Sequence, residues 1–435
     1  MILEANLDLR QNLSRLFSNG SGGLSLCAAL VSIEGADYHI MVELTPPDVS
    51  EVRMKNIAYA MSSRDNNFDV LRLFAALLVL WGHSYPLTAD GKDDIFSKCL
   101  FGYDMAGSFA VMIFFVISGF LVTKSASERT TAEYLAARAL RILPALACVV
   151  LLTVVVIGPI LTNLSLIDYF RDRWTQSYLT NIFVFGIQYD IPSATAGLLY
   201  PGAINGSLWT LSLECGFYVI LAVLFHFRLF TPRTAFVFIA AAVLANFYCT
   251  YVLGLSWNRP GPTVWKGAPL YQTAVNGSAF LLGSAFWIYR DRFLLSSGMV
   301  LVCAVALFAA QGTWSAAVVY SLTVPYLVMF FALGTPFKIN LRPVGDLSYG
   351  VYLVAFPIQQ TVIGLLGPHI YATKVSLIAT PIVLAIAYFS WWFIEKPCLS
   401  LKRGSGYAAE YRGQREATQN ADAGFVEPDS LPVRS

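Results

Sequence analysis

Three ionisable side chains in otherwise apolar segments could carry out chemistry. Arg72 and His83 lie in FDVLRLFAALLVLWGHSYPL, and Glu214 lies in NGSLWTLSLECGFY. A charged side chain at the centre of a membrane helix costs about 2.5–3.5 kcal/mol, so such residues usually face the protein interior and serve a function. Eleven positions make three helical turns, so Arg72 and His83 share one helix face, about 16 Å apart. That face offers a cation that can bind an anion and an imidazole that can accept a proton.

Glu214 and His83 could form a catalytic pair. Glu214 comes about two turns after Ser207, and His83 lies near the end of its own segment, so both side chains can occupy a similar depth in a membrane. A hydrogen bond between them would orient the imidazole as a general base. The alternatives are structural. Glu214 can form an ion pair with Arg72, or Arg72 and His83 can reach the lipid headgroups at the two ends of their helix.

Two further segments offer residues for anion binding or helix packing. Arg138 and Arg141 stand three positions apart in RALRILPAL, on one helix face. They can grip a phosphate, or they can be ordinary positive residues beside a membrane. Ser118 lies beside Gly119 in FFVISGFLVTKS. Small residues in such a segment usually allow two helices to pack closely, and Ser118 could also act as a relay.

The elements that carry these residues are expected to be membrane-spanning helices. Of 435 residues, 56% are hydrophobic and only 13% are charged, a composition that suits the bilayer and not water. The formal net charge of +2 gives no indication of a nucleic-acid partner. The seven cysteines are scattered singly, so the sequence indicates neither a disulfide framework nor a metal site.

Apolar segments follow one another from Phe68 onward. We expect an all-α, polytopic integral membrane protein with about ten transmembrane helices, near residues 68–87, 108–124, 140–161, 208–227, 234–254, 272–289, 294–311, 313–333, 348–366 and 374–394. About twice as many lysines and arginines then lie on the side of the two termini as on the other side. The positive-inside rule therefore predicts that both termini are cytoplasmic.

Three regions are expected along the chain. Residues 1–60 are mixed in polarity and carry acidic residues where a signal peptide would have basic ones. We predict that they are a disordered or non-native extension and that Met61 is the native start. Residues 61–397 form the transmembrane domain. Residues 398–435 are polar and are predicted to be a disordered cytoplasmic tail.

The order of these motifs resembles acyltransferase family 3, a group of membrane O-acyltransferases that includes polysaccharide and Nod-factor O-acetylating enzymes. The resemblance covers the chain from Phe68 to Pro397. It rests on Arg72 and His83 separated by ten residues, FFVISGF, Arg138 and Arg141 before Pro144, Asn205, Trp209 and Glu214 in NGSLWTLSLE, Ser348, Tyr349 and Tyr352 in GDLSYGVYLVAFP, and FIEKP.

The resemblance implies a multi-pass enzyme of the bacterial inner (cytoplasmic) membrane. Such an enzyme transfers an acetyl or other short acyl group from cytoplasmic acetyl-CoA, or a related acyl-CoA, to a hydroxyl of a cell-surface or secreted carbohydrate, without a metal. The site residues that it implies are His83 and Glu214 for catalysis, Arg72, Arg138, Arg141 and Ser118 for the donor, and Asn205, Trp209 and Tyr349 for the acceptor.

One position departs from the family pattern. Many members carry a histidine two residues before the proline of the late segment, where this chain has Ala355. The difference indicates a subgroup that handles its acceptor differently. An exopolysaccharide unit, a lipopolysaccharide O-antigen, peptidoglycan, a lipo-oligosaccharide or a small glycosylated metabolite would each fit as acceptor.

The alternative function from another class is a proton-coupled transporter or flippase of a glycan or small molecule. The same ionisable residues would then form a proton relay or a substrate path. A transporter needs no acyl-CoA, so acceptor-dependent cleavage of the thioester separates the two functions. A purely structural or sensory protein gives no reason for Arg72, His83 and Glu214 to occur together.

Overall fold

The computed structural model describes residues 55–63, 65–88, 94, 96–97, 105–265, 267–367 and 369–401. Most of the expected extension and most of the expected tail, residues 1–54 and 402–435, lie outside the described residues. Within those ranges the regular structure is almost entirely helical, with four strands of two or three residues each. The expected all-α class is confirmed.

Helical segments occur at all of the expected span positions in the described part of the chain. They are α3 (Phe68–Leu87), α5 (Ala106–Glu128), α6 (Thr131–Leu152) continued by η2 (Thr153–Ile157) and α7 (Gly158–Leu161), α11 (Leu208–His226), α12 (Pro232–Phe247) continued by η4 (Tyr248–Val252), α13 (Leu270–Ile288), α14 (Ser297–Ala310), α15 (Ala316–Met329) continued by η5 (Phe330–Gly334), α16 (Ser348–Leu366), and α17 (Ala372–Ser390) continued by η6 (Trp391–Glu395) and α18 (Lys396–Ser400).

Short elements connect these helices. They are β1 (Lys55–Asn56), α2 (Ile57–Ala60), α8 (Leu166–Arg171), α9 (Arg173–Tyr178), η3 (Leu179–Ile182), α10 (Pro192–Thr195), β2 (Thr263–Trp265), β3 (Ala268–Pro269) and β4 (Leu294–Leu295). Strand β1 pairs antiparallel with β4, and β2 pairs antiparallel with β3.

Eight of the helical segments are long and apolar enough to cross a membrane, among the residues that the structure describes. The two other expected spans correspond to α13 and α14. Helix α14 has 14 residues, and α13 buries the polar side chains of Gln272, Asn276 and Ser278. The polytopic architecture is confirmed, and the polar groups of α13 turn toward the protein and away from lipid.

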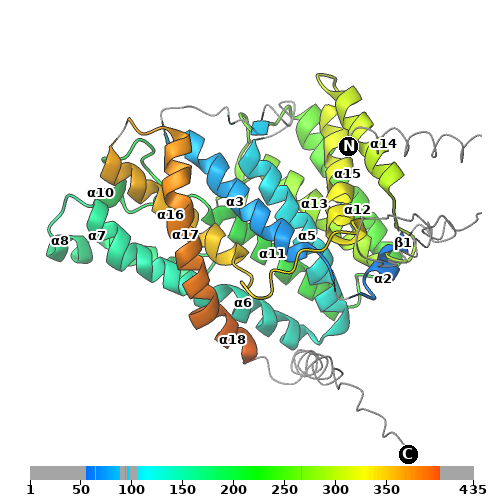
Figure 1. Cartoon of the computed structure of the whole chain (residues 1–435), viewed down its shortest axis with the longest axis horizontal. Helices are drawn as coiled ribbons and strands as arrows, with labels where there is room; N and C mark the ends of the chain where they lie inside the picture. The colour runs from blue at the N-terminus through cyan, green and yellow to red at the C-terminus, as the bar shows by residue number, and fades with distance from the viewer. Residues whose placement is uncertain are drawn as a thin grey trace, which may run out of the picture. The chain divides into compact units, whose positions relative to one another are not determined.

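Helix α5 packs between α3 and α13, and α16 packs against α3 and α17 (Figure 1). The absence of a side chain at Gly119 allows the close approach of α13, because a Cβ atom there would lie 1.9 Å from the carbonyl oxygen of Phe280. The hydroxyl of Thr123 donates a hydrogen bond of 2.8 Å to that of Ser284 across the same interface. The predicted packing role of the small residues in FFVISGF is therefore confirmed for Gly119.

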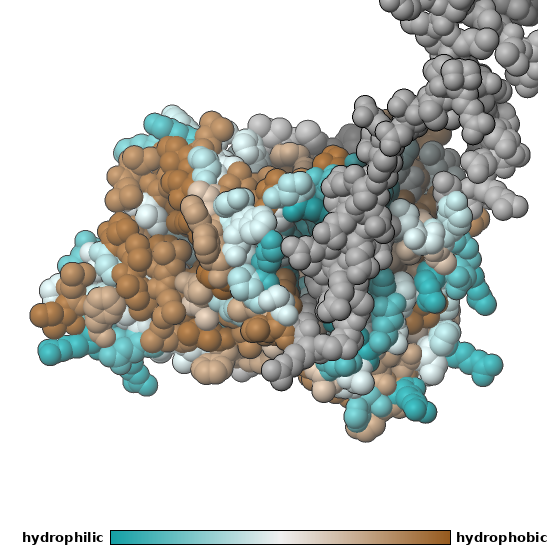
Figure 2. Space-filling model, turned by 60° about the horizontal axis from the view of Figure 1, so that its bottom comes forward, coloured by the Kyte–Doolittle hydropathy of each residue, from teal (hydrophilic) through white to brown (hydrophobic). Residues whose placement is uncertain are grey.

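The exterior of the bundle carries many exposed apolar side chains. Helices α6 and α7 with their connection expose Leu151, Val155 and Ile160, and α17 exposes Leu377 and Phe389. Figure 2 shows one side of the molecule, with hydrophobic residues gathered over the left half of the view. Such a surface is expected where lipid, and not water, surrounds the helices.

Residues 55–60 belong to the described body of the protein. Their strand β1 pairs with β4, and Ile57 is fully buried and donates its backbone N–H to the carbonyl of Phe293 at 3.0 Å. The end of the predicted extension thus contacts the helices. The assignment of Met61 as the native start stays a prediction.

Candidate active site

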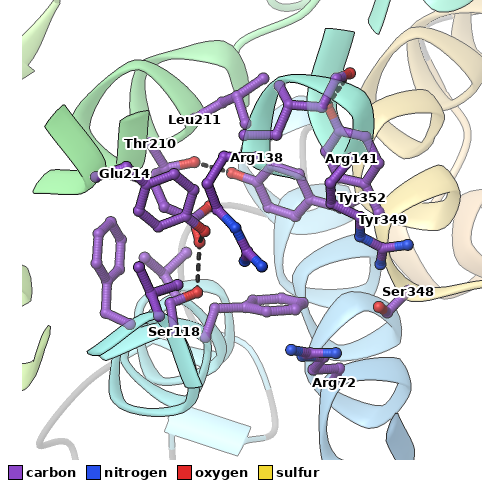
Figure 3. A pocket seen from close by; sticks show the side chains of 16 residues that line it. Arg72, Ser118, Arg138, Arg141, Thr210, Leu211, Glu214, Ser348, Tyr349 and Tyr352 are labelled. Carbon is purple, nitrogen blue, oxygen red and sulfur yellow. Dashed lines mark hydrogen bonds between the residues drawn. The ribbon is translucent and has the colours of Figure 1, made fainter. Parts of the chain in front are cut away.

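Six of the site residues predicted from the sequence gather at one cavity, which we call the arginine cavity. Arg72 comes from the first turns of α3, and Arg138 and Arg141 come from α6. Ser118, Glu214 and Tyr349 also line it, and its empty space, which includes solvent at the open mouth, is about 770 Å³. Figure 3 shows the three guanidinium groups around this common space.

The start of α6 sets the position of its two arginines. Thr130 and Glu133 form a capping box, in which each side chain accepts a hydrogen bond from the other residue's backbone N–H. The helix therefore begins at Thr131, and Arg138 and Arg141 follow in its second and third turns. Three residues apart, they lie on the same face, as the sequence predicts.

Arg72 and Arg141 share a carboxylate that the sequence analysis did not identify. Asp346, just before α16, lies 2.5 Å from Arg141 and 3.5 Å from Arg72. Arg141 also lies 3.3 Å from Glu395, whose side chain is 1% exposed. We call Arg72, Arg141, Asp346 and Glu395 the ion-pair network. These guanidinium groups are partly buried, 24% exposed in Arg72 and 21% in Arg141, and they need such counter-charges because an isolated charge is costly in a medium of low dielectric constant.

Asp346 is ionised by its surroundings. Burial raises the pKa of Asp346, but the positive charges of Arg141 and Arg72 and the hydrogen bonds from Ser348 lower it more, so the pKa lies below its usual range. The Ser348 hydroxyl donates to Asp346 at 2.5 Å and the Ser348 backbone N–H donates at 3.3 Å. The same carboxylate therefore binds the first residue of α16 and two arginines.

Arg138 differs from the other two arginines. Its guanidinium lies 5.8 Å above the ring of Tyr218, and its Nε has no hydrogen-bond partner among the described residues. No ion pair of Arg138 occurs in the described part of the chain. Of the three cations at the cavity, Arg138 has the most unused capacity to bind an anion.

The predicted hydrogen bond between Glu214 and His83 is not formed. The carboxylate of Glu214 instead accepts hydrogen bonds from the hydroxyls of Ser118 and Tyr218, inside the arginine cavity (Figure 3). The alternative pair of Glu214 with Arg72 is not formed either, because Arg72 pairs with Asp69 and Asp346. Glu214 satisfies its charge with neighbouring hydroxyls on α5 and on its own helix.

His83 lines a second cavity, which we call the histidine cavity. It lies where the end of α3 meets the first turns of α5, α11 and α13, and Trp209 also lines it. The His83 ring packs edge-on against Phe356, with ring centroids 5.3 Å apart. Its Nδ1 is buried and has no hydrogen-bond partner among the described residues. The imidazole is therefore oriented by packing and not by a carboxylate.

The two cavities share one wall. Val111, Thr210 and Tyr352 line both of them. The hydroxyl of Tyr352 is hydrogen-bonded to that of Thr210 and donates a hydrogen bond of 3.0 Å to the backbone carbonyl of Ser207. We call these three residues the partition. A group bound in one cavity lies one side-chain layer away from the other cavity.

The remaining predicted residues divide between the cavities and the scaffold. Tyr349 lines the arginine cavity and donates its hydroxyl to the carbonyl of Ile142 at 2.9 Å. Asn205 lines neither cavity. Its amide nitrogen donates to the carbonyl of Leu353, and its amide oxygen accepts from the N–H of Ser207, both at 3.1 Å. Asn205 therefore ties the start of α11 to α16, which leaves its predicted acceptor role without support from the geometry.

Asp346 and Glu395 are the charged residues that sequence reasoning missed. Both lie inside motifs that had been identified, Asp346 in GDLSYG and Glu395 in FIEKP. Buried carboxylates need cationic partners, and this chain has few charged residues. This signal could have predicted that both carboxylates pair with Arg141.

The chain is similar to known proteins over most of its length. The protein-family model described as an acyltransferase domain matches residues 65–395. The chain is 33% identical over 343 residues to the O-acetyl transferase of Shigella phage Sf6, covering 78% of this chain and 97% of that protein. It is 29% identical over 360 residues to nodulation protein 10 of Rhizobium leguminosarum bv. viciae, covering 78% and 95% of the two chains.

A third relative is more distant. The putative membrane-bound transacylase BcsY of Komagataeibacter xylinus is 23% identical over 394 residues, covering 86% of this chain and 94% of that protein. No solved structure matches the chain. The match to the family model includes both cavities and the partition between them.

Proposed function

The chain belongs to acyltransferase family 3 and is a membrane acyltransferase, and we propose that it transfers an acetyl or other short acyl group from acyl-CoA to a carbohydrate hydroxyl. The observation that carries the proposal is the pair of adjoining cavities, one with three arginines and one with a histidine, separated only by the partition. An anionic donor and a hydroxyl acceptor need two such environments.

The arginine cavity suits acyl-CoA. The donor carries several phosphate charges, and arginine binds phosphate oxygens with two parallel hydrogen bonds. Arg138 would make the main contact, because its Nε is unpartnered. Arg72 and Arg141 would offer further guanidinium N–H groups from positions that Asp346 fixes. Glu214 and Ser118 would line the path of the acyl end toward the partition.

His83 would act as the general base from the other side of the partition. The acceptor oxygen attacks the thioester carbonyl carbon, the bond between that carbon and sulfur breaks, and the hydroxyl proton passes to the imidazole and then to the CoA sulfur. This direct transfer needs the thioester to reach across Val111, Thr210 and Tyr352. Glu214 would act from the arginine cavity, on the donor and not on the imidazole.

The proposed orientation puts the arginine cavity toward the cytoplasm. Arg72 and Ser348 begin α3 and α16, and the expected topology places these two starts on the side of the termini. The protein would then lie in the bacterial inner membrane, with its termini in the cytoplasm where acyl-CoA is made. The histidine cavity would face the opposite side, where the acceptor arrives.

The test uses the full chain purified into lipid nanodiscs. Acetyl-CoA is supplied with de-O-acetylated surface polysaccharide from the host, and free CoA and ester acetyl groups are measured together. We expect CoA release that depends on polysaccharide, matches the ester formed and is lost in His83→Ala. A parallel assay uses the same protein in liposomes. Movement of glycan across the liposome membrane without cleavage of any thioester would contradict the proposal and favour a transporter.

A further inference from the structure

The histidine cavity differs from the arginine cavity in charge. Among the described residues that line it, His83 is the only ionisable group apart from tyrosines, and no aspartate, glutamate, lysine or arginine takes part. Three arginines and one glutamate line the arginine cavity. Because an unpaired charge in a buried cavity is costly, the histidine cavity favours a ligand group without charge.

Buried polar atoms without partners surround the histidine cavity. Ser207 is 2% exposed and Gln272 is 7% exposed, and neither the Ser207 hydroxyl nor the Gln272 side-chain oxygen has a hydrogen-bond partner among the described residues. The same holds for the hydroxyl of Ser108 and for Nδ1 of His83. Each buried atom left unpaired costs about 1–3 kcal/mol. These four groups belong to residues that line the cavity and come from four segments of the chain, and a ligand rich in hydroxyls would offer them partners.

Aromatic side chains complete the same cavity. Trp209, Trp257 and Tyr271 line it, and Trp257 is 37% exposed, so it lies at the mouth. Flat aromatic faces beside hydrogen-bonding groups suit a ligand that is apolar on its ring faces and polar at its edge. A sugar ring has both properties, because its C–H bonds point to the faces and its hydroxyls to the rim.

We propose that the histidine cavity binds one uncharged sugar ring of the acceptor and excludes uronates and phosphorylated sugars. The ring packs against Trp209 and Trp257, and its hydroxyls pair with Ser207 and Gln272 so that one of them faces His83. This inference rests on the proposed transferase function and adds the class of acceptor that the site accepts.

Gly107 provides a position at which a side chain can be added in the wall of the cavity. It lines the histidine cavity, and a Cβ atom built on it meets no atom within 4 Å. Its neighbour across the helix interface, Gly82, is the opposite case, because a Cβ there would lie 2.6 Å from the backbone nitrogen of Gly107. Gly107→Leu therefore occupies the sugar's space, and Gly107→Ala is the matched small substitution.

The experiment measures binding of neutral methyl hexosides, each paired with its uronate, to the nanodisc protein without acyl-CoA, by saturation-transfer NMR. We expect a neutral hexoside to bind and its uronate to bind at least about tenfold more weakly. Gly107→Leu and Trp257→Ala should each lower the affinity for the neutral sugar about tenfold, which corresponds to the loss of about one contact. Gly107→Ala should lose less affinity than Gly107→Leu, because it adds a single methyl group. Trp314→Ala, at a tryptophan that is 81% exposed and outside the cavity, should bind as wild type.

The outcomes separate this inference from the proposed function. Binding of a neutral hexoside that is lost in Gly107→Leu, without any acetyl transfer, would support the site and overturn the transferase function. Transfer to polysaccharide that is unaffected by Gly107→Leu and Trp257→Ala would support the function and overturn the site. Uronates that bind as well as neutral sugars, or a panel in which no neutral hexoside binds, would also overturn the site.

Discussion

Replacing Asp346 by asparagine should destabilise the protein, because Asp346 joins two helices through Arg72 and Arg141. Its side chain is 14% exposed and lies 2.5 Å from Arg141. Breaking a whole buried ion pair costs about 3–5 kcal/mol. Here Arg141 keeps Glu395 at 3.3 Å, and the asparagine oxygen still accepts from Ser348. We therefore expect a loss of about 2 kcal/mol in the free energy of unfolding.

The matched control is Asp69→Asn, which removes the other carboxylate beside Arg72. Asp69 also lies 3.5 Å from Arg72, but its side chain is 52% exposed. Solvent-exposed pairs contribute about 0–1 kcal/mol, so this variant should unfold at nearly the wild-type temperature. Thermal unfolding of both variants in one detergent, followed by intrinsic fluorescence, gives the comparison. Equal losses in the two variants would refute the assignment of Asp346 as the central carboxylate.

The pH dependence of the stability that Asp346→Asn loses provides an independent check. The pKa of Asp346 lies below its unfolded value near 3.9, so the carboxylate contributes its stability fully at higher pH and loses it as the pH falls through the folded pKa. The difference in the free energy of unfolding between wild type and Asp346→Asn should be constant above about pH 5 and should shrink below about pH 4. A difference that grows on acidification would contradict the charge assignment.

Three further predictions concern the reaction. His83→Ala should lower kcat by about 10²- to 10⁴-fold and leave acyl-CoA binding intact, as measured by turnover and by equilibrium binding of a non-hydrolysable acyl-CoA analogue. Arg138→Ala should raise the KM for acyl-CoA about tenfold with a smaller effect on the acceptor, and Arg138→Lys should restore part of it, because lysine keeps the charge but not the paired hydrogen bonds. Tyr352→Ala should open the partition and increase CoA release in the absence of acceptor. Tyr352→Phe keeps the ring and should increase this release less. Unchanged release in both variants would mean that the partition does not separate the cavities.

The sequence alone determined the class of the protein and most of its chemistry-bearing residues. Its apolar segments fix a helical membrane architecture, because a backbone in lipid must satisfy its hydrogen bonds within each helix. The three-residue spacing placed Arg138 and Arg141 on one face, and the rarity of charge in apolar segments pointed to Arg72, His83 and Glu214. These arguments need only local periodicity, which a single helix already provides.

Tertiary structure decided which of these residues meet. His83 and Glu214 line different cavities, and Glu214 pairs with Ser118 and Tyr218, because helix rotation and tilt determine where each side chain points. The role of Asp346 depends on contacts across 274 and 205 positions of the chain, to Arg72 and Arg141. No spacing rule in the sequence reaches that far, because such contacts arise only when the helices have packed against one another.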